Sequence, residues 1–178
     1  MLLTGPDRDT AVLSKPANDK ITVLVLCTGN SARSIMAEAI LNTVGGVLFR
    51  AYSAGSKPTG VVNPLALEQI QRLDKGNTIA ANSKSWDTFS RPDAPKLDLV
   101  LTVCGNAARE SCPIFIGKPE RIHWGFPDPA GSSSDIVKER YAFAACFEKM
   151  RDQISRLVAE TPANASRESI FTSIRSWE

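Results

Sequence analysis

The chain has 178 residues, of which 43% are hydrophobic and 22% charged, and its 21 basic and 19 acidic side chains leave a formal net charge of +2. This length and apolar fraction suit one compact domain, while the near balance of charge gives no support for binding to nucleic acid or to a membrane surface. No apolar stretch approaches the roughly 20 residues that span a bilayer, and the start of the chain lacks a secretory pattern, so we expect a cytoplasmic protein.

The first elements can be predicted from hydrophobic period and turn residues. Residues 1–20 contain several prolines and aspartates without a sustained period, and we predict a mobile or loosely docked N-terminal arm. The continuous apolar run 21–26 predicts a strand buried on both faces, as in a parallel sheet. Helical spacing begins at Arg33 and stops at a pair of glycines, after which 48–53 predicts a second strand.

Strands and helices continue to alternate along the rest of the chain. Asn63 and Pro64 form a cap and a first-turn proline that open a further helix. The remaining predicted elements are strands at 97–103 and 121–124, a short helix or loop at 106–112 and a long helix at 134–160. This alternation predicts an α/β sandwich with a parallel sheet, in which ligands bind beyond the carboxyl ends of the strands. We expect the domain to span 21–160, and the tail 161–178 is left open between a short helix and a frayed end.

The strongest chemical signal follows the first strand, where residues with small side chains separate Cys27 from Arg33. Small side chains let successive backbone N–H groups curl around a tetrahedral anion, and Arg33 would clamp two of its oxygens. The same positive charge stabilises a thiolate, so Cys27 is expected to be ionised near neutral pH and to attack the bound oxyanion. A buried cysteine beside a surface arginine is the alternative, but it leaves the small residues unexplained. The residues expected to bind the anion are Thr28, Gly29, Asn30, Ser31, Ala32, Arg33 and Ser34.

Two residues of this loop have a predicted structural role. Ser34 can donate its hydroxyl to the Cys27 thiolate or cap the helix, and both interpretations remain open. Asn30 tolerates a left-handed backbone, and we expect its side chain to tie down the loop's own backbone.

A second candidate is Asp128, which stands between Pro127 and Pro129 on the loop after the fourth predicted strand. The prolines restrict where its carboxyl group points, so Asp128 can act as a general acid for the oxygen that leaves the oxyanion. An aspartate in a loop is otherwise most often a turn former. His123 is expected to be a packed or hydrogen-bonded side chain, because the chain has 1 histidine and no second one to share a metal. We predict no metal site.

The chain has 4 cysteines, with neither a CxxC pair nor the density of a secreted disulfide framework. We therefore expect reduced thiols at rest. Cys104 ends a predicted strand and Cys112 follows a flexible segment, so the two are placed for thiol exchange if that segment moves. An ester hydrolase needs neither thiol, although small buried thiols are also common in protein cores. Cys146 lies in an apolar helical stretch and is predicted to belong to the core.

From about residue 21 to 158 the chain resembles the arsenate reductases built on the low-molecular-weight protein tyrosine phosphatase fold. The resemblance implies a three-layer sandwich in which a four-stranded parallel sheet is flanked by helices. It rests on Cys27-Thr28-Gly29-Asn30-Ser31-Ala32-Arg33-Ser34, Tyr52-Ser53-Ala54-Gly55, Val62-Asn63-Pro64, Cys104 with Cys112-Pro113, and His123-Trp124-Gly125 before Asp128-Pro129.

The resemblance also implies a reaction, the reduction of arsenate to arsenite. Cys27 would attack arsenate, Cys104 would attack Cys27 and release arsenite, and Cys112 would attack Cys104 to leave an oxidised pair. An external thioredoxin- or glutaredoxin-type reductant, the latter with glutathione, would then reduce this pair, with no bound cofactor. Phosphate and sulfate would compete as oxyanions, and the protein would act as a monomer or weak homodimer.

Two other functions remain open. A low-molecular-weight protein tyrosine phosphatase or small phosphate ester hydrolase would need Cys27, Arg33 and Asp128 but not Cys104. Phosphatases of this fold typically carry aromatic residues after the Asp-Pro pair to grip a phenyl ring, whereas residues 130–132 are Ala, Gly and Ser here. A non-catalytic module that only binds an oxyanion is the third possibility.

Overall fold

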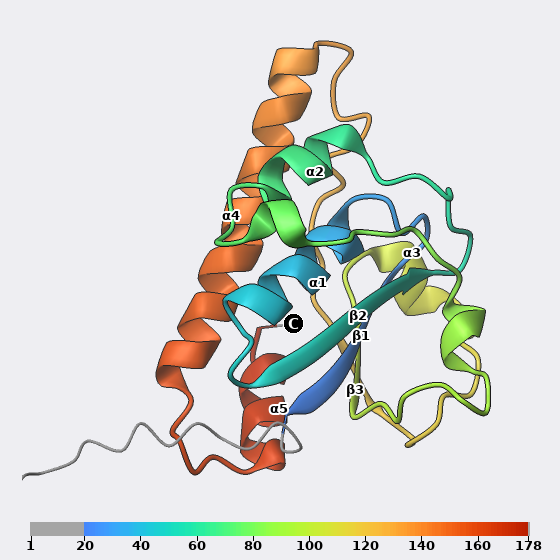
Figure 1. Cartoon of the computed structure of the whole chain (residues 1–178), viewed down its shortest axis with the longest axis vertical. Helices are drawn as coiled ribbons and strands as arrows, with labels where there is room; N and C mark the ends of the chain where they lie inside the picture. The colour runs from blue at the N-terminus through green and yellow to red at the C-terminus, as the bar shows by residue number, and fades with distance from the viewer. Residues whose placement is uncertain (1–19, 178) are drawn as a thin grey trace, which may run out of the picture.

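The computed structural model describes residues 20–177 (Figure 1), so the predicted N-terminal arm lies, except for Lys20, outside the described residues. Strands and helices alternate along the chain as the sequence predicts. The elements are β1 (Ile21–Cys27), α1 (Arg33–Thr43), β2 (Phe49–Gly55), α2 (Pro64–Ile70), the 3₁₀ helices η1 (Gly76–Thr78) and η2 (Trp86–Phe89), β3 (Leu99–Thr102), α3 (Gly105–Arg109), β4 (Glu120–His123), α4 (Ile136–Glu160) and α5 (Arg167–Arg175).

The strands form one parallel sheet in the order β2-β1-β3-β4. This arrangement confirms the predicted four-stranded parallel sheet flanked by helices. The register pairs Cys27 with Gly55 across β1 and β2, and Leu26 with Thr102 across β1 and β3. The carboxyl ends of the strands therefore lie at one edge of the sheet, where Cys27 is the last residue of its strand.

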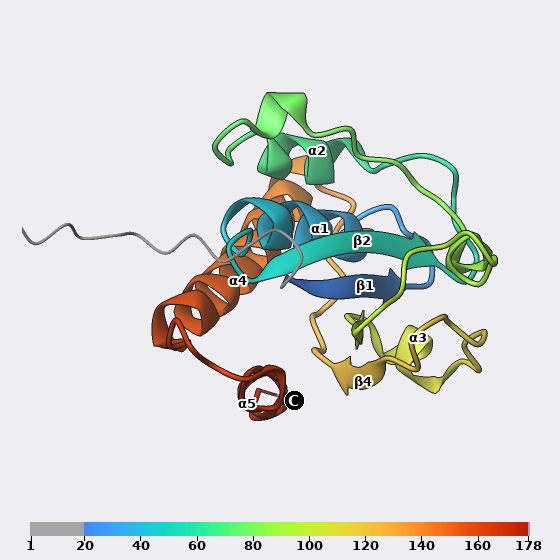
Figure 2. The same ribbon diagram turned by 60° about the horizontal axis from the view of Figure 1, so that its bottom comes forward.

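Both faces of the sheet are covered, which explains why β1 is apolar throughout. Four successive residues of β1, 23–26, are 0% exposed, and their side chains alternate between two cores. Val23 and Val25 belong to the larger core, to which α1, α4 and α5 contribute buried side chains. Leu24 and Leu26 belong to a smaller core that includes Phe89 of η2. In Figure 2, α1 and α2 lie on one side of β1 and β2.

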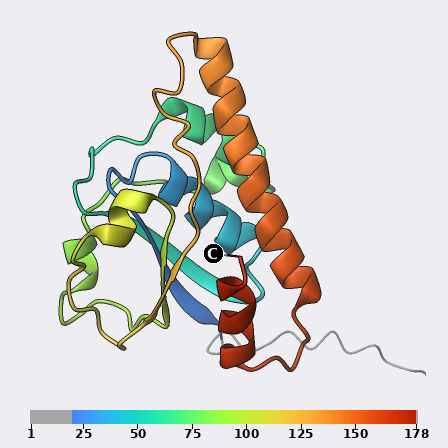
Figure 3. The same cartoon turned by 180° about the vertical axis from the view of Figure 1, so that it is seen from behind.

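The long helix α4 runs along one side of the molecule in Figures 1 and 3. It begins at Asp135, whose side chain accepts a hydrogen bond from the Val137 N–H. Its inward face carries an apolar stripe with helical spacing, which packs on α1 and α2. The residues of that stripe are Phe143, Cys146, Phe147, Met150, Ile154 and Leu157.

The tail after residue 160, left open by the sequence, contains a helix that packs into the larger core. Ile170, Phe171 and Ile174 of α5 are buried there. The Trp124 indole N–H, just after β4, donates to the Ile174 carbonyl at 2.9 Å. The ring of Trp177 lies 5.6 Å from that of Trp124. The core thus continues past the predicted domain boundary.

Most other differences from the predicted elements are shifts of one to three residues at their ends. The helix that begins at Pro64 ends at Ile70, and the chain then turns so that Leu73 still reaches the core. The segment predicted as a short helix or loop contains α3, a helix of 5 residues. No helix within residues 20–177 is long and apolar enough to cross a membrane.

Candidate active site

The loop between β1 and α1 wraps around the sulfur of Cys27. The Asn30 N–H donates to Cys27 Sγ at 3.2 Å, and Ser34 Oγ lies 2.9 Å from the same sulfur. Cys27 is 5% exposed at the edge of the sheet where ligands bind in α/β folds. Ala32 precedes α1 and has no side-chain acceptor, so it does not compete with an anion for the first-turn N–H groups. The loop therefore suits a nucleophilic sulfur that faces a bound oxyanion.

Asn30 anchors this loop. Its φ of 43° is left-handed, as the sequence predicts, and its side chain is buried. Its Nδ2 donates to Ser34 Oγ at 2.9 Å and to Ser53 Oγ at 3.0 Å, while its Oδ1 accepts from the Lys84 N–H at 2.7 Å. The prediction that Asn30 ties down the loop's own backbone is wrong, because the buried amide finds its partners on α1, β2 and the segment before η2.

The end of β2 approaches the loop closely at Gly55. A Cβ at this position would lie 2.4 Å from the Thr28 carbonyl oxygen and 3.0 Å from the backbone nitrogen of Asn30. Only glycine leaves room for that contact, which gives the Tyr-Ser-Ala-Gly motif of β2 a physical reason.

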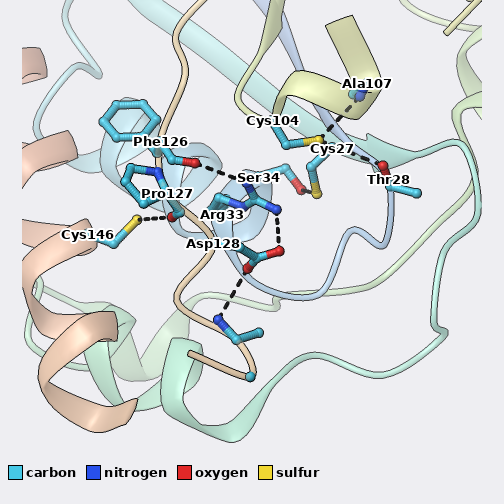
Figure 4. Close-up of polar contacts among 12 residues, drawn as sticks. Cys27, Thr28, Arg33, Ser34, Cys104, Ala107, Phe126, Pro127, Asp128 and Cys146 are labelled. Atoms are coloured by element: carbon cyan, nitrogen blue, oxygen red, sulfur yellow. Dashed lines mark hydrogen bonds and ion pairs between the residues drawn. The ribbon is translucent and has the colours of Figure 1, made fainter. Parts of the chain in front are cut away.

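Arg33 and Asp128 meet at the mouth of the loop, as Figure 4 shows. Arg33 Nη2 lies 2.5 Å from Asp128 Oδ2, and Nη1 donates to the Phe126 carbonyl at 3.0 Å. The Arg33 side chain is 14% exposed and that of Asp128 is 53% exposed. The second oxygen of Asp128 accepts from the Ala130 N–H at 3.2 Å, so this residue is both a turn former and a carboxyl group facing the loop.

Cys104 lies next to the same loop. It follows β3, is 4% exposed, and its Sγ is hydrogen-bonded to Thr28 Oγ1 at 3.7 Å. The Ala107 N–H donates to the same sulfur at 3.4 Å, so the Cys104 side chain also caps α3. A second thiol, that of Cys104, therefore contacts Thr28, the residue that follows Cys27 in the chain (Figure 4).

Cys112 contacts the other core. It is half-buried and packs against the smaller core, whereas Cys104 belongs to the larger one. Cys112 lines a small cavity with Thr102 and His123, the last residues of β3 and β4, so it lies near the carboxyl edge of the sheet but on the other face from Cys104. Burial raises the pKa of the Cys112 thiol, the charge of Arg121 opposes this rise, and the charge of Glu110 adds to it. All four cysteines are free thiols.

The remaining candidates occupy structural positions. Cys146 is a core residue as predicted, and burial raises the pKa of its thiol to about 11. His123 Nδ1 lies 2.8 Å from Thr102 Oγ1, which fits the prediction of a hydrogen-bonded side chain. In the described part of the chain, no group of three or more His, Cys, Asp or Glu side chains is arranged to hold a metal ion.

Three polar residues behind the loop were not among the predicted site residues. Ser53 of β2 donates to Glu38 Oε2, and the Lys84 ammonium lies 3.7 Å from that oxygen. Asn30, Ser34 and Glu38 recur every four residues, a spacing that places polar groups on one helix face and could have indicated this network. Lys84 lies in a loop and has no comparable signal.

The chain is similar to known proteins. Residues 22–167 match the family described as low molecular weight phosphotyrosine protein phosphatase. An arsenate reductase from Halalkalibacterium halodurans is 36% identical over 140 residues, which cover 79% of this chain and 94% of that protein.

Two solved structures share the fold. The arsenate reductase of Archaeoglobus fulgidus has a TM-score of 0.56 at 24% identity, over 78% of this chain and 99% of that one. A thioredoxin-dependent arsenate reductase from Corynebacterium glutamicum has a TM-score of 0.53 at 23% identity, over 88% of this chain and 65% of that one. At these identities the structural likeness concerns the fold alone.

Proposed function

Because the chain belongs to the low molecular weight phosphotyrosine protein phosphatase family, we propose that it is an arsenate reductase with Cys27 as its nucleophile. The observation that carries this proposal is the contact between Cys104 and Thr28, which brings a second thiol to the nucleophile loop. A hydrolase has no use for that thiol, whereas reduction of arsenic needs a second electron-donating sulfur.

In the first step, the Cys27 thiolate attacks the arsenic of arsenate. A sulfur–arsenic bond forms and an arsenic–oxygen bond breaks, and Asp128 supplies the proton with which that oxygen leaves as water. Arg33 and the loop N–H groups hold the remaining oxygens and offset their negative charge. The arsenic is still pentavalent at this point.

In the second step, the Cys104 thiolate attacks Cys27 Sγ. A disulfide forms between the two sulfurs, the sulfur–arsenic bond breaks, and its electron pair stays on arsenic, which leaves as arsenite. Cys104 Sγ is also the cap of α3, so this disulfide removes an acceptor from the Ala107 N–H. We infer that α3, only 5 residues long, loosens as a result.

In the third step, the Cys112 thiolate attacks Cys104 Sγ and releases Cys27 as a thiolate. We expect residues 105–112 to move in this step, because Cys112 packs against the smaller core and Cys104 against the larger one. A dithiol reductant then reduces the exposed Cys104–Cys112 disulfide. Thioredoxin is supported by the thioredoxin-dependent structure described above, and glutaredoxin with glutathione is the other candidate. Both chemistries belong to a reducing compartment such as the cytoplasm.

The proposal is tested by comparing arsenate reduction and phosphate ester hydrolysis in the wild type and in Cys104→Ser. Arsenate reduction with a thiol reductant should be lost in the variant, while Cys146→Ser, the matched control at a buried core thiol, should retain it. Repeated arsenate turnover by Cys104→Ser would contradict the relay. Ester hydrolysis by both proteins, with arsenate reduction by neither, would favour the phosphatase.

A further inference from the structure

Segment 57–63, which joins β2 to α2, is hydrogen-bonded to the loop between β1 and α1 through its backbone. The donors are the N–H groups of residues 57, 59 and 63, and the acceptors are the carbonyls of Thr28, Gly29 and Ser31, at 2.9, 3.0 and 2.8 Å respectively. These carbonyls of the nucleophile loop therefore point outward, toward segment 57–63.

The direction of each carbonyl fixes the direction of the next N–H group in the loop. A trans peptide is planar, and its C=O and N–H bonds point to opposite sides. The peptide between Gly29 and Asn30 shows the result, because its carbonyl accepts from Thr59 while its N–H donates to Cys27 Sγ at 3.2 Å. By the same geometry, the N–H groups of Gly29 and Ala32 point away from segment 57–63 and into the loop.

Both ends of the segment are held by elements of the core. Gly55, the last residue of β2, pairs with Cys27 in the sheet and lies two positions before Lys57. Asn63 is the N-cap of α2, and its Oδ1 accepts from the Leu65 N–H at 2.9 Å. The first and last of the three donors are therefore fixed relative to the sheet and to a packed helix.

The middle of the segment is suited to contacts made by its backbone. Pro58 stands between the donors at 57 and 59, where its ring restricts φ and its missing N–H costs no contact with the loop. Gly60 has a left-handed φ of 76°. The side chains of Lys57, Thr59 and Val61 are exposed. The three donors are thus placed by the path of the backbone, and burial of these side chains does not place them.

We propose that segment 57–63 is a positioning element for the oxyanion: by holding three loop carbonyls outward, it directs the N–H groups of Gly29, Asn30 and Ala32 inward before the anion binds. N–H groups that are already oriented bind an oxyanion more tightly than groups that must first turn toward it. The segment acts through peptide planes that belong to the loop. The proposal rests on the proposed function only in taking this loop as the oxyanion site.

The wild-type protein provides the first test, a titration with inorganic phosphate followed by proton–nitrogen NMR. The amide protons of Gly29 and Ala32 should shift downfield as phosphate binds, because each gains an anionic acceptor. The amide protons of Lys57 and Thr59, which already donate to carbonyls, should shift much less. If phosphate protects Cys27 from alkylation while the Gly29 and Ala32 protons do not shift, the inward direction of these N–H groups is wrong.

The role of the segment itself is tested by replacing one N–H with an ester oxygen. The hydroxy-acid analogue of valine is placed at position 59, and Thr59→Val, with its peptide bond intact, is the matched control. The ester removes the hydrogen bond to the Gly29 carbonyl, so the phosphate concentration that half-protects Cys27 from iodoacetamide should rise about fivefold. The same ester at Val61, whose N–H donates to Thr59 Oγ1, should change this concentration less than about twofold.

The thermal unfolding midpoint of each protein checks that it is folded. A change that only weakened the fold would lower this midpoint without changing the phosphate affinity of the folded protein. An unchanged half-protecting concentration in the position-59 ester, or an equal rise in the Val61 ester, would overturn the proposal. If the position-59 ester does not fold, the hydroxy-acid analogue of leucine at position 57, compared with Lys57→Leu, tests the bond to the Thr28 carbonyl in the same way.

The same measurements separate this inference from the proposed function. Arsenate and phosphate should both protect wild-type Cys27 from alkylation if the loop binds oxyanions. Absence of protection would defeat the proposed function. Protection of the wild type together with unchanged affinity in the esters would defeat the role of segment 57–63 alone.

Discussion

Arg33 and Asp128, the first residue of α1 and a residue of the loop after β4, form an ion pair with 2.5 Å between Nη2 and Oδ2. Because Asp128 is 53% exposed, the pair adds little to stability. The ion pair instead affects oxyanion binding, because an oxyanion that enters the loop would compete with Asp128 for the same guanidinium nitrogen of Arg33. The carboxyl group is thus kept beside the position where it would donate a proton.

Asp128→Asn should separate binding from chemistry. We expect kcat for arsenate to fall about a hundredfold or more, because the proton donor is lost. Phosphate should protect Cys27 from alkylation at a severalfold lower concentration, because the competing carboxylate charge is also gone. Asp135→Asn is the matched control, since asparagine still caps α4 and the residue does not contact Arg33. Equal losses in both variants would rule out a specific role for Asp128.

Thr28→Val should slow the second step without affecting the first. Valine keeps the shape of threonine but removes the hydroxyl hydrogen-bonded to Cys104 Sγ, and loss of one such bond corresponds to about a tenfold slower attack. Rapid-quench measurement of arsenite release in a single turnover checks this, with Thr28→Ser as the control that retains the hydroxyl. Alkylation of Cys27 at the same rate in all three proteins would show that the nucleophile itself is unaffected.

The last thiol step should respond to pH in opposite directions in two variants. Arg121 lowers and Glu110 raises the pKa of the half-buried Cys112 thiol. Arg121→Gln should therefore reduce the fraction of Cys112 present as thiolate at a given pH. The rate at which the Cys104–Cys112 disulfide forms should then increase only at a higher pH than in the wild type. Glu110→Gln should shift this increase to lower pH, and both shifts should shrink at high salt. Shifts of the same sign would contradict this assignment.

The C-terminal helix should contribute to global stability. Ile174 is 2% exposed in the larger core, so Ile174→Ala should reduce the free energy of unfolding by about 2–4 kcal/mol in a urea titration. Ile114 is 91% exposed, and Ile114→Ala should change it by less than about 0.5 kcal/mol. If the two variants unfold at the same urea concentration, α5 is not part of the cooperative unit.

The fold was predictable where the sequence pattern is strictly local. The apolar run of β1 and the Asn63–Pro64 start of α2 carry their own signals, since strand burial and helix capping depend on adjacent residues. Helix α5 was left open because its apolar residues need a partner surface, which includes Trp124, 50 residues away from Ile174. Contacts at that separation leave no periodic trace in one sequence.

For the site, the sequence indicates the nucleophile loop but not its supports. Cys27 and Arg33 could be identified as a pair from their spacing in the chain. Asp128 could be identified from the two prolines that flank it. The Lys84 contacts with Asn30 and Glu38 join segments 54 and 46 positions apart in the printed sequence, and only the folded sheet brings them together. The face of the sheet on which Cys112 lies could not be predicted for the same reason, because nothing local shows that the chain changes faces after α3.

The most direct test of the thiol relay is to map the disulfides of the wild-type protein by mass spectrometry after one turnover with arsenate and no reductant. We predict one disulfide, between Cys104 and Cys112, with Cys27 and Cys146 free and one equivalent of arsenite released. Arsenite release with all four thiols still reduced, or a final disulfide that includes Cys146, would contradict the account.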